Sequence, residues 1–382
     1  MSGLAPRPNF VDTVRAFLVD EALPFWSKVG AYPNGCFVEH LDLAGRPVDP
    51  GFTRTRVQAR QIYVFSHASE LGLVAGRDLV RRAVEFLIAS AWLGPERGWA
   101  SRITREGAVI DPSYDLYDVA FVLFALAWAY RILGDERYRV IAHQTLDYLD
   151  ATARSPNGGY HHDNFRSVPR LQNPHMHLVE ALNAWLEISK EDRFRERAEE
   201  ILVLFESRFV DSRSGAVREY FNDDWTPVGD PRGRLVEPGH QFEWAWIIGH
   251  NGRLSGKPRL PLMRRLIASG LEHGFDPVSG LTVDQVDVDG AVLAASHRLW
   301  PQTEAIKATL AGGEFLGEPA AERVGLIVQA LFDRFFAAGP APGTWMDHFD
   351  AQGVGIADKV PASSLYHITL AFLEALRLLG RY

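Results

Sequence analysis

Two histidines, His240 and His367, stand near the starts of helices that the sequence predicts, and each has polar neighbours at helical spacing. His240, Glu243 and Trp244 lie at i, i+3 and i+4 in EPGHQFEWAW, so the three side chains share one helix face. A carboxylate one turn from an imidazole can fix the tautomer and the orientation that general-base catalysis requires. We therefore expect acid–base chemistry in which Glu243 orients His240.

The placement of both histidines in the first turn of a helix bears on their charge. The positive end of the helix dipole disfavours an imidazolium. His367 lies in SSLYHITLAF, where Ser363 or Ser364 can serve as the N-cap. Both His240 and His367 are therefore expected to be neutral near neutral pH and able to accept a proton.

A polar stripe follows one face of the helix predicted over residues 54–73. Arg56, Arg60, Tyr63 and His67 are spaced at i, i+4, i+7 and i+11. Such a stripe is often a solvated face, but the remaining faces of this helix are apolar and are expected to be buried. We therefore interpret the stripe as the lining of a site.

Three further helix starts carry residues that the same site can use. Tyr117 opens one helix, and Trp300 and Glu304 lie at i and i+4 of another. Asn173 precedes a proline, as an N-cap residue does before proline at the first helical position, and His177 lies on the same face. Tyr117 can equally be a core residue and Asn173 only a cap, and the sequence leaves these alternatives open.

Histidine and cysteine spacing argues against a metal centre. His175 and His177 lie about 200° apart around a helix, so they cannot chelate one ion. The histidines and the aspartate of residues 161–163 fall in a predicted hairpin, where successive side chains face opposite ways. The single cysteine, Cys36, can form neither a disulfide framework nor a cysteine-based metal site. No metal ligand is therefore expected.

Motifs of several other enzyme classes are missing from the chain. The sequence holds no GxxxxGKS/T phosphate loop, no GxGxxG after a strand and no GxSxG elbow. A glycosidase with paired carboxylates stays open, because Asp and Glu occur in several predicted hairpins.

The elements that must position these residues form a repeat. Six times a glycine opens a short segment with strand residues on either side of turn residues, as in a β-hairpin, and a long apolar helix follows. The glycines are Gly35, Gly98, Gly158, Gly215, Gly280 and Gly343. Their successive spacings of 63, 60, 57, 65 and 63 residues indicate a repeat architecture.

Helical periodicity predicts twelve helices, which can be arranged in only a few ways. Their ranges are 8–29, 54–73, 77–92, 115–133, 137–151, 173–188, 192–209, 239–254, 259–272, 298–311, 318–335 and 364–380. The segment 115–133 is apolar nearly all round and is expected to be buried, whereas 192–209 has a charged face and is expected outside. We therefore expect an all-α fold, a single-domain (α/α)6 barrel over residues 1–382, with six inner helices whose N-terminal ends meet the hairpins at one mouth.

Composition and charge narrow the class of protein further. The 382 residues carry a net charge of −8 with a pI near 5.9, which argues against a nucleic-acid partner. The N-terminus lacks the pattern of a signal peptide, and no run of about 18 apolar residues predicts a membrane span. We expect a soluble cytoplasmic protein, and the sequence leaves a homo-oligomer open.

Six segments together resemble the motifs of the N-acylglucosamine 2-epimerase superfamily. They are RVQARQIYVF (56–65), LYDVAF (116–121), NPHMHLVEA (173–181), EPGHQFEWAW (237–246), LWPQTEA (299–305) and LYHITLAF (365–372). They occur in order and span most of the chain. The superfamily has the same (α/α)6 barrel that the helix pattern predicts.

The resemblance implies a sugar substrate and chemistry without a metal or a nucleotide cofactor. The catalytic histidines of the superfamily fall on His240 and His367. Its substrate-contacting positions fall on Arg56, Tyr117, Asn173, His177, Glu243 and Trp300. The stretch KVPASSLYH (359–367) lacks a tryptophan that cellobiose 2-epimerases carry there, and it resembles the mannose isomerase group instead.

The reaction that this resemblance implies is the reversible isomerisation of D-mannose and D-fructose through a cis-enediol. His367 would be the main acid/base, His240 would move protons on the oxygens or open the ring, and Arg56 would stabilise the enediolate. A 2-epimerase of a monosaccharide, a disaccharide or N-acylglucosamine and a non-catalytic sugar-binding barrel are the alternatives. Whether the sugar is phosphorylated stays open, since Arg60, Arg166 and Arg298 could meet a phosphate.

Overall fold

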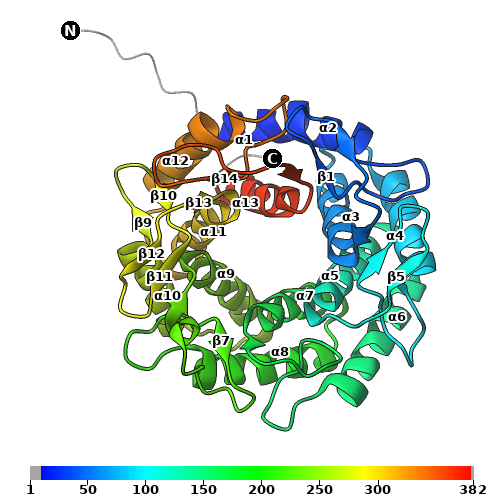
Figure 1. Cartoon of the computed structure of the whole chain (residues 1–382), viewed down its shortest axis with the longest axis horizontal. Helices are drawn as coiled ribbons and strands as arrows, with labels where there is room; N and C mark the ends of the chain where they lie inside the picture. Colours follow the sequence, from blue (N-terminus) through cyan, green and yellow to red (C-terminus); the bar gives the residue numbers. More distant parts are fainter. Residues whose placement is uncertain (1–9, 380–382) are drawn as a thin grey trace.

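The computed structural model describes residues 10–379, and these residues form a ring of paired helices around a central opening (Figure 1). Within that range the inner helices are α3 (Thr55–Glu70), α5 (Leu116–Leu133), α7 (Asn173–Ser189), α9 (Pro238–Ser255), α11 (Leu299–Leu316) and α13 (Ser364–Leu379). Neighbouring inner helices pack against one another all the way round, and α13 packs against α3. The expected (α/α)6 barrel is confirmed.

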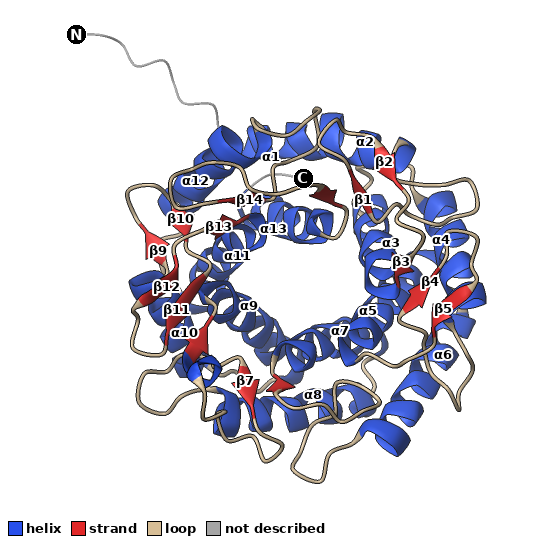
Figure 2. Cartoon of the chain, in the orientation of Figure 1, coloured by secondary structure: helices blue, strands red, loops and turns tan. Residues whose placement is uncertain are grey.

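The outer layer consists of helices that cover the inner ring, several of which end in a π-helical turn (Figure 2). They are α1 (Phe10–Ala16) with η1 (Phe17–Ala22) and α2 (Leu23–Lys28), α4 (Arg77–Ala91), α6 (Glu136–Tyr148) with η2 (Leu149–Ala153), α8 (Asp192–Leu204) with η3 (Phe205–Phe209), α10 (Leu260–His273), and α12 (Ala321–Ala330) with η5 (Leu331–Phe336). As predicted, α8 lies in this outer layer with charged residues exposed.

The predicted helix boundaries agree with the structure to within about three residues except at the end of α11. The prediction stops at residue 311, before Gly312 and Gly313, but the helix continues to Leu316 and ends at Gly317, which adopts a left-handed conformation with φ 71°. Packing against α9, α10 and α13 outweighs the weak helix propensity of the two glycines. The predicted residues 8, 9 and 380 lie outside the described part of the chain.

Helix α5 shows why the inner ring is stable. The Asp115 side chain caps its start by accepting from the backbone N–H of Tyr117 at 2.8 Å, and Gly134 ends it in the left-handed conformation. By length and composition α5 could cross a membrane, contrary to the expectation that no segment would, yet most of this helix is buried inside the barrel wall. Its apolar surface is therefore accounted for by packing.

Short strands surround the mouth of the barrel, where the N-terminal ends of the inner helices gather (Figure 2). The strands are β1 (His40–Leu41), β2 (Pro47–Val48), β3 (Thr53–Arg54), β4 (Arg102–Ile103), β5 (Val109–Asp111), β6 (Arg170–Leu171), β7 (Tyr220–Phe221), β8 (Leu235–Val236), β9 (Phe275–Asp276), β10 (Leu281–Thr282), β11 (Gln285–Asp287), β12 (Val292–Ala294), β13 (His297–Arg298), β14 (His348–Phe349) and β15 (Val360–Pro361). A 3₁₀ turn, η4 (Pro231–Arg234), precedes β8.

The strands link each repeat to the next one. The strand that leads into an inner helix pairs antiparallel with the hairpin of the following repeat, as in β3–β4, β6–β7, β8–β11 and β13–β14. Ahead of α5 a single bridge between Asp115 and Asp163 takes this place. The last pair joins β15 to β1 with His40 opposite Pro361, so the strand pairing closes into a circle.

The six repeated glycines have one backbone role. All of them have φ between 67° and 94°, a region that other residues rarely adopt. At Gly35, moreover, an added Cβ would lie 2.4 Å from the carbonyl oxygen of Arg82. The glycines thus turn the chain from an outer helix into the hairpin that precedes the next inner helix.

Candidate active site

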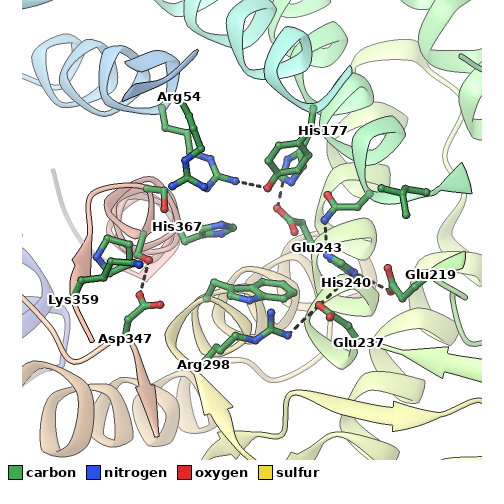
Figure 3. A pocket seen from close by; sticks show the side chains of 18 of the residues that line it. Arg54, His177, Glu219, Glu237, His240, Glu243, Arg298, Asp347, Lys359 and His367 are labelled. Carbon is green, nitrogen blue, oxygen red and sulfur yellow. Dashed lines mark hydrogen bonds and ion pairs between the residues drawn. The ribbon is translucent and has the colours of Figure 1, made fainter. Parts of the chain in front are cut away.

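A cavity of about 530 Å³ occupies the mouth of the barrel, and all six inner helices contribute to its wall. Its lining includes Arg60 of α3, Tyr117 of α5, Asn173 and His177 of α7, His240 and Glu243 of α9, Trp300 of α11, and Ser364 and His367 of α13. The structure thus brings together most of the residues that the sequence singled out. His240 and His367 face the same space from opposite sides (Figure 3).

His240 is oriented by Glu219 rather than by Glu243. The Nδ1 atom of His240 lies 2.9 Å from Oε1 of Glu219, and because a carboxylate only accepts, Nδ1 carries the proton. Gln172 donates to the other oxygen of Glu219 at 2.9 Å, and Trp244 donates to Gln172 at 2.7 Å. This chain of hydrogen bonds fixes the imidazole plane and leaves Nε2 towards the cavity.

The expectation that His240 is neutral is wrong. Burial disfavours the imidazolium, but the charges of Glu219, Glu237 and Glu243 outweigh this effect and raise the pKa of His240 to about 9. Asn173 lies 3.2 Å from Nε2 of His240 through Nδ2, and its Oδ1 atom has no hydrogen-bond partner. When the side-chain amide of Asn173 is rotated by 180°, Oδ1 takes the place of Nδ2 and accepts a hydrogen bond from the protonated Nε2 atom of His240. Asn173 is therefore a neighbour of the imidazole and does not cap α7, whose N-cap position is Gln172.

His367 has the opposite charge state, as the sequence predicted for it. Its Nδ1 atom lies 2.8 Å from Oε1 of Glu304, so Nδ1–H donates and Nε2 stays free. Burial, together with the positive charges of Arg60 and Lys307, holds the pKa of His367 well below its usual range. The indole of Trp300 lies between the two histidines, with ring centroids 5.0 Å from His240 and 5.9 Å from His367.

Glu243 lies deep in the cavity next to His177. The shortest distance between its carboxylate and Nδ1 of His177 is 3.9 Å, while Glu180 takes the direct contact to the same atom at 3.1 Å. Tyr366 donates to the second oxygen of Glu180 at 2.5 Å. Glu243 itself is only 1% exposed, and its carboxyl group lines the floor of the cavity.

Of the two arginines in the predicted stripe, Arg60 lines the central cavity and Arg56 does not. Arg60 is 5% exposed and donates to the Tyr117 hydroxyl at 2.6 Å, and its guanidinium lies 4.1 Å from the ring centroid of Phe121. Within residues 10–379 the structure records no ion pair for Arg60, and its Nε atom has no hydrogen-bond partner. A buried cation without a carboxylate partner is costly unless a ligand supplies the negative charge.

Arg56 is held by two aspartates instead. Its Nε atom lies 2.6 Å from Oδ1 of Asp118, and Nη2 lies 2.6 Å from Oδ2 of Asp115. It lines a smaller side cavity of about 330 Å³ and not the central one. This side cavity adjoins the central one, since Arg60, Tyr117 and Asn173 line both. Because the two aspartates balance the charge of Arg56, its role towards a ligand stays a prediction for which the geometry offers less support than for Arg60.

Three other predicted positions differ from expectation. Glu304 does not line the cavity but orients the His367 ring through a hydrogen bond with its Nδ1 atom. Tyr63 and His67 do not continue the polar stripe into the site. They lie 2.9 Å apart through Oη and Nδ1, and His67 belongs to a separate cavity of about 290 Å³ lined also by residues near the C-terminal ends of inner helices, where burial lowers its pKa to about 3.

Arg298 lines the cavity and is paired with two carboxylates. It lies 3.2 Å from Glu237 and 3.1 Å from Asp284. Glu219 is the most important residue that the sequence analysis missed. It lies directly before β7 in the segment GAVREYF. In a strand its side chain falls on the same face as the apolar residues two positions before and after it, and a charged residue in that place was the available signal.

Three sets of side chains within residues 10–379 have geometry compatible with a metal ion. They are His177, Glu180 and Glu243; Glu243, Glu304 and His367; and His250, Glu314 and Glu374. In the first set the Glu180 oxygens are hydrogen-bonded to His177 and Tyr366, and in the second the Glu304 oxygens contact His367 and Lys307. In these two sets the glutamate oxygens that could bind a metal already contact other side chains. The expectation of metal-independent chemistry stays a prediction.

Comparison with known proteins places the chain in one family. The family model of N-acylglucosamine 2-epimerase (GlcNAc 2-epimerase) matches residues 35–371. A mannose-6-phosphate isomerase of Rhizobium meliloti (strain 1021) is 34% identical over 368 residues, which cover 94% of each chain. A D-mannose isomerase of Thermobifida fusca is 28% identical over 331 residues, or 80% of this chain and 79% of the relative.

A solved structure supports the same fold. The cellobiose 2-epimerase from Bacillus thermoamylovorans B4167 superposes with a TM-score of 0.88 at 19% identity, over 96% of this chain and 99% of the other. With the family model matching most of the chain, and with a relative above 30% identity along nearly its whole length, the conclusion is direct. The chain belongs to the N-acylglucosamine 2-epimerase family.

Proposed function

We propose that this protein is an aldose–ketose isomerase that interconverts D-mannose and D-fructose through a cis-enediol. The observation that carries the proposal is the pair of histidines on one cavity, with His367 neutral and His240 protonated. An isomerase needs a base at carbon and an acid at oxygen, and the two imidazoles supply one of each. The names of two relatives, a mannose-6-phosphate isomerase and a D-mannose isomerase, support the same reaction class.

The proposed reaction moves one proton between adjacent carbons. The Nε2 atom of His367 removes the C2 proton of the open-chain aldose, the electron pair forms the C1–C2 double bond, and Nε2–H of His240 protonates O1. His367 then returns its proton to C1 while O2–H gives its proton back to His240, which leaves the ketone at C2. Each positioned acid or base contributes roughly 10²- to 10⁴-fold to the rate.

In this proposal Arg60 stabilises the negative charge that develops during the reaction. Negative charge develops on the oxygens of the enediolate, and a preorganised donor there is most valuable because it acts only as the charge forms. Arg60 is buried, lines the cavity and has an Nε atom without a partner. His240 would also protonate the ring oxygen when the cyclic sugar opens.

The direct test is incubation of the protein with D-mannose in D₂O containing EDTA, followed by proton NMR. Fructose carrying deuterium at C1 is the expected product, because the proton on His367 exchanges with solvent during the enediol's lifetime. Loss of the reaction on adding EDTA would contradict metal-independent catalysis. D-mannose 6-phosphate is assayed in parallel, since a relative carries that substrate in its name.

A 2-epimerase is the second candidate function, and a specific feature favours it. His240 faces the same cavity as His367 from the opposite side, so a proton could return to C2 on the other face. Glucose deuterated at C2, without fructose, would identify this reaction in the same experiment. An unchanged spectrum with every sugar tested would favour a non-catalytic sugar-binding barrel.

The pH profile should reveal the pair of charge states. With His367 as base and His240 as acid, kcat/KM is expected to be flat from below pH 6.5 up to a limb near pH 9. In Glu219→Gln the charge that raises the pKa of His240 is lost, so this alkaline limb should move down by about one pH unit or more. Glu237→Gln is the matched control, because that carboxylate lies 3.8 Å from the same Nδ1 atom and should shift the limb less.

The same pKa shift has a consequence for stability. The pKa of His240 is raised above its ordinary 6.5 to about 9, so the protonated imidazole stabilises the folded state fully below pH 6.5, and this contribution is lost as the pH rises through 9.

An alkaline limb of kcat/KM that stays in place in Glu219→Gln would refute the assignment of His240 as the acid.

A further inference from the structure

The two histidines of the site make the same hydrogen bond but differ in what lies behind it. Each donates Nδ1–H to a glutamate, His240 to Glu219 at 2.9 Å and His367 to Glu304 at 2.8 Å. Behind Glu219 stands the neutral amide of Gln172, 2.9 Å away. Behind Glu304 stands a lysine, Lys307. Each histidine and its glutamate form a dyad, and the two dyads differ in the group that contacts the glutamate: a neutral amide at Glu219 and a lysine at Glu304.

Lys307 is fully buried on α11, one turn beyond Glu304. Its side chain has 0% exposure, and Nζ lies 2.6 Å from Oε2 of Glu304. Nζ also lies 4.4 Å from the ring centroid of Trp246, which adds a cation–π contact. Glu304, together with Glu243 and Glu180, raises the pKa of Lys307, so the ammonium group stays charged despite its burial. Burial and the charge of Glu243 raise the pKa of Glu304 well above its usual range, and Lys307 is the group that opposes this rise and favours the carboxylate form.

We propose that Lys307 is a positioning residue that neutralises Glu304 and thereby keeps His367 free of a second proton. The proposal rests on the proposed isomerase function for its catalytic meaning. A glutamate that keeps its full negative charge next to an imidazole favours the imidazolium, as at His240. A glutamate paired with a buried lysine still orients the ring through Nδ1, yet the net charge behind the ring is zero.

The other charged groups around His367 have opposing effects on its protonation, and Lys307 determines which effect is larger. Arg60 of α3, His177 of α7 and His240 of α9 oppose a positive charge on His367. Glu243 of α9 lies close to both Glu304 and His367, with ligand atoms of the three side chains within 4.8 Å of one another. Asp347 lies on the loop before β14, lines the same cavity and accepts a hydrogen bond from Ser364. Removing Lys307 leaves the carboxylates of Glu304 and Glu243 near the ring without the paired ammonium, so the dyad then binds an additional proton.

The test is Lys307→Met, which keeps the length of the side chain and removes its charge. The acid limb of kcat/KM is expected to move up by about one to two pH units, with activity lost near pH 6 and regained near pH 8. In parallel, the ¹⁵N NMR titration of the His367 imidazole, assigned by its disappearance in His367→Gln, should show the same upward shift. This titration needs no turnover, so it separates failure of this inference from failure of the proposed reaction.

The double variant Lys307→Met/Glu304→Gln provides the second arm. It removes both charges, so it leaves no unpaired buried ion and folds even where the single variant does not. Its acid limb and its His367 titration are expected to return to those of the wild type. Lys257→Met, at an exposed lysine, is the control and should change neither.

Two results would overturn the inference. One is a single variant with uniformly lower activity at every pH and an unchanged His367 titration, since that is the behaviour of a purely structural residue. The other is a double variant whose limb is shifted up as far as that of the single variant. Lys307 would then act on His367 directly and not through Glu304.

Discussion

Replacing His367 by glutamine is expected to lower kcat for mannose isomerisation by about 10²- to 10⁴-fold while the protein stays folded. Glutamine has nearly the volume of histidine, and its amide can keep a hydrogen bond to Glu304, which His367 contacts at 2.8 Å. What it cannot do is accept and release a proton near neutral pH. The variant should therefore bind the sugar with little change in KM and fail at the step that breaks the C2–H bond.

The measurement is kcat and KM together with deuterium incorporation into residual mannose in D₂O. Both turnover and exchange should fall together, because both need the same proton transfer. His143→Gln is the matched control, since His143 lies on the outer helix α6 and does not line the cavity. Exchange that persists at the wild-type rate in His367→Gln would assign proton abstraction to another residue.

The second large effect separates two arginines that are one helical turn apart. Arg60→Met is expected to lower kcat by about 10²-fold or more, because the developing enediolate loses its positively charged donor. The melting temperature should stay near that of the wild type or rise, since the change removes a buried cation for which the described residues supply no ion pair. Steady-state kinetics and thermal unfolding on the same samples give both readouts.

Arg56→Met is expected to show the reverse pattern. It leaves Asp118, whose side chain is 2% exposed, without its partner. The free energy of unfolding should fall by about 1–3 kcal/mol, the usual cost of an unsatisfied buried group, while kcat of the folded fraction changes little. If Arg56→Met instead abolished turnover with no loss of stability, the sequence-based role of Arg56 would be right and that of Arg60 wrong.

The helices and their order could be predicted from the sequence because the information is local. Period, turn residues and apolar faces are properties of short windows, and they locate the first turn in which His240 and His367 stand. The end of α11 was missed for the same reason, since Gly312 and Gly313 weaken a helix locally while contacts with other helices hold it together.

The partners of the catalytic candidates could not be predicted in this way. Glu243 shares a helix face with His240, so local spacing favoured it, yet the carboxylate that bonds His240 is Glu219, on the preceding hairpin. Glu304 lies one turn from Trp300, which suggested a shared role in sugar binding, but its contact is His367, 63 residues away. Helix spacing reports which side chains share a face and not which elements meet that face.

The charge of His240 was misjudged for a related reason. The helix dipole acts through the first turn and disfavours an imidazolium by a fraction of a kcal/mol to about 1 kcal/mol. Glu219 on the preceding hairpin and Glu237 and Glu243 at the start of the same helix act over short distances in a buried site, and their sum is larger. The contact from Glu219 and the burial of all three carboxylates around one imidazole are properties of the tertiary structure that local spacing does not give.

The strand pair that joins β15 to β1 differs from the other junctions in the length of chain that it closes. Five junctions connect repeats that are adjacent along the chain, as in linear repeat proteins. The sixth must bring distant segments together, and contacts there span 301 residues from Gln61 to Ala362 and 317 residues from Trp26 to Gly343. Its loop-closure entropy is therefore larger than that of the other five.

Arg60 and His367 lie on the two helices that this closure joins. A chain with most of its helices formed but its circle still open would therefore have no complete cavity, because Arg60 and His367 would lie on separate ends. Under the proposed function, sugar turnover is thus expected of the closed ring alone, and it would report closure of the ring rather than the amount of helix formed.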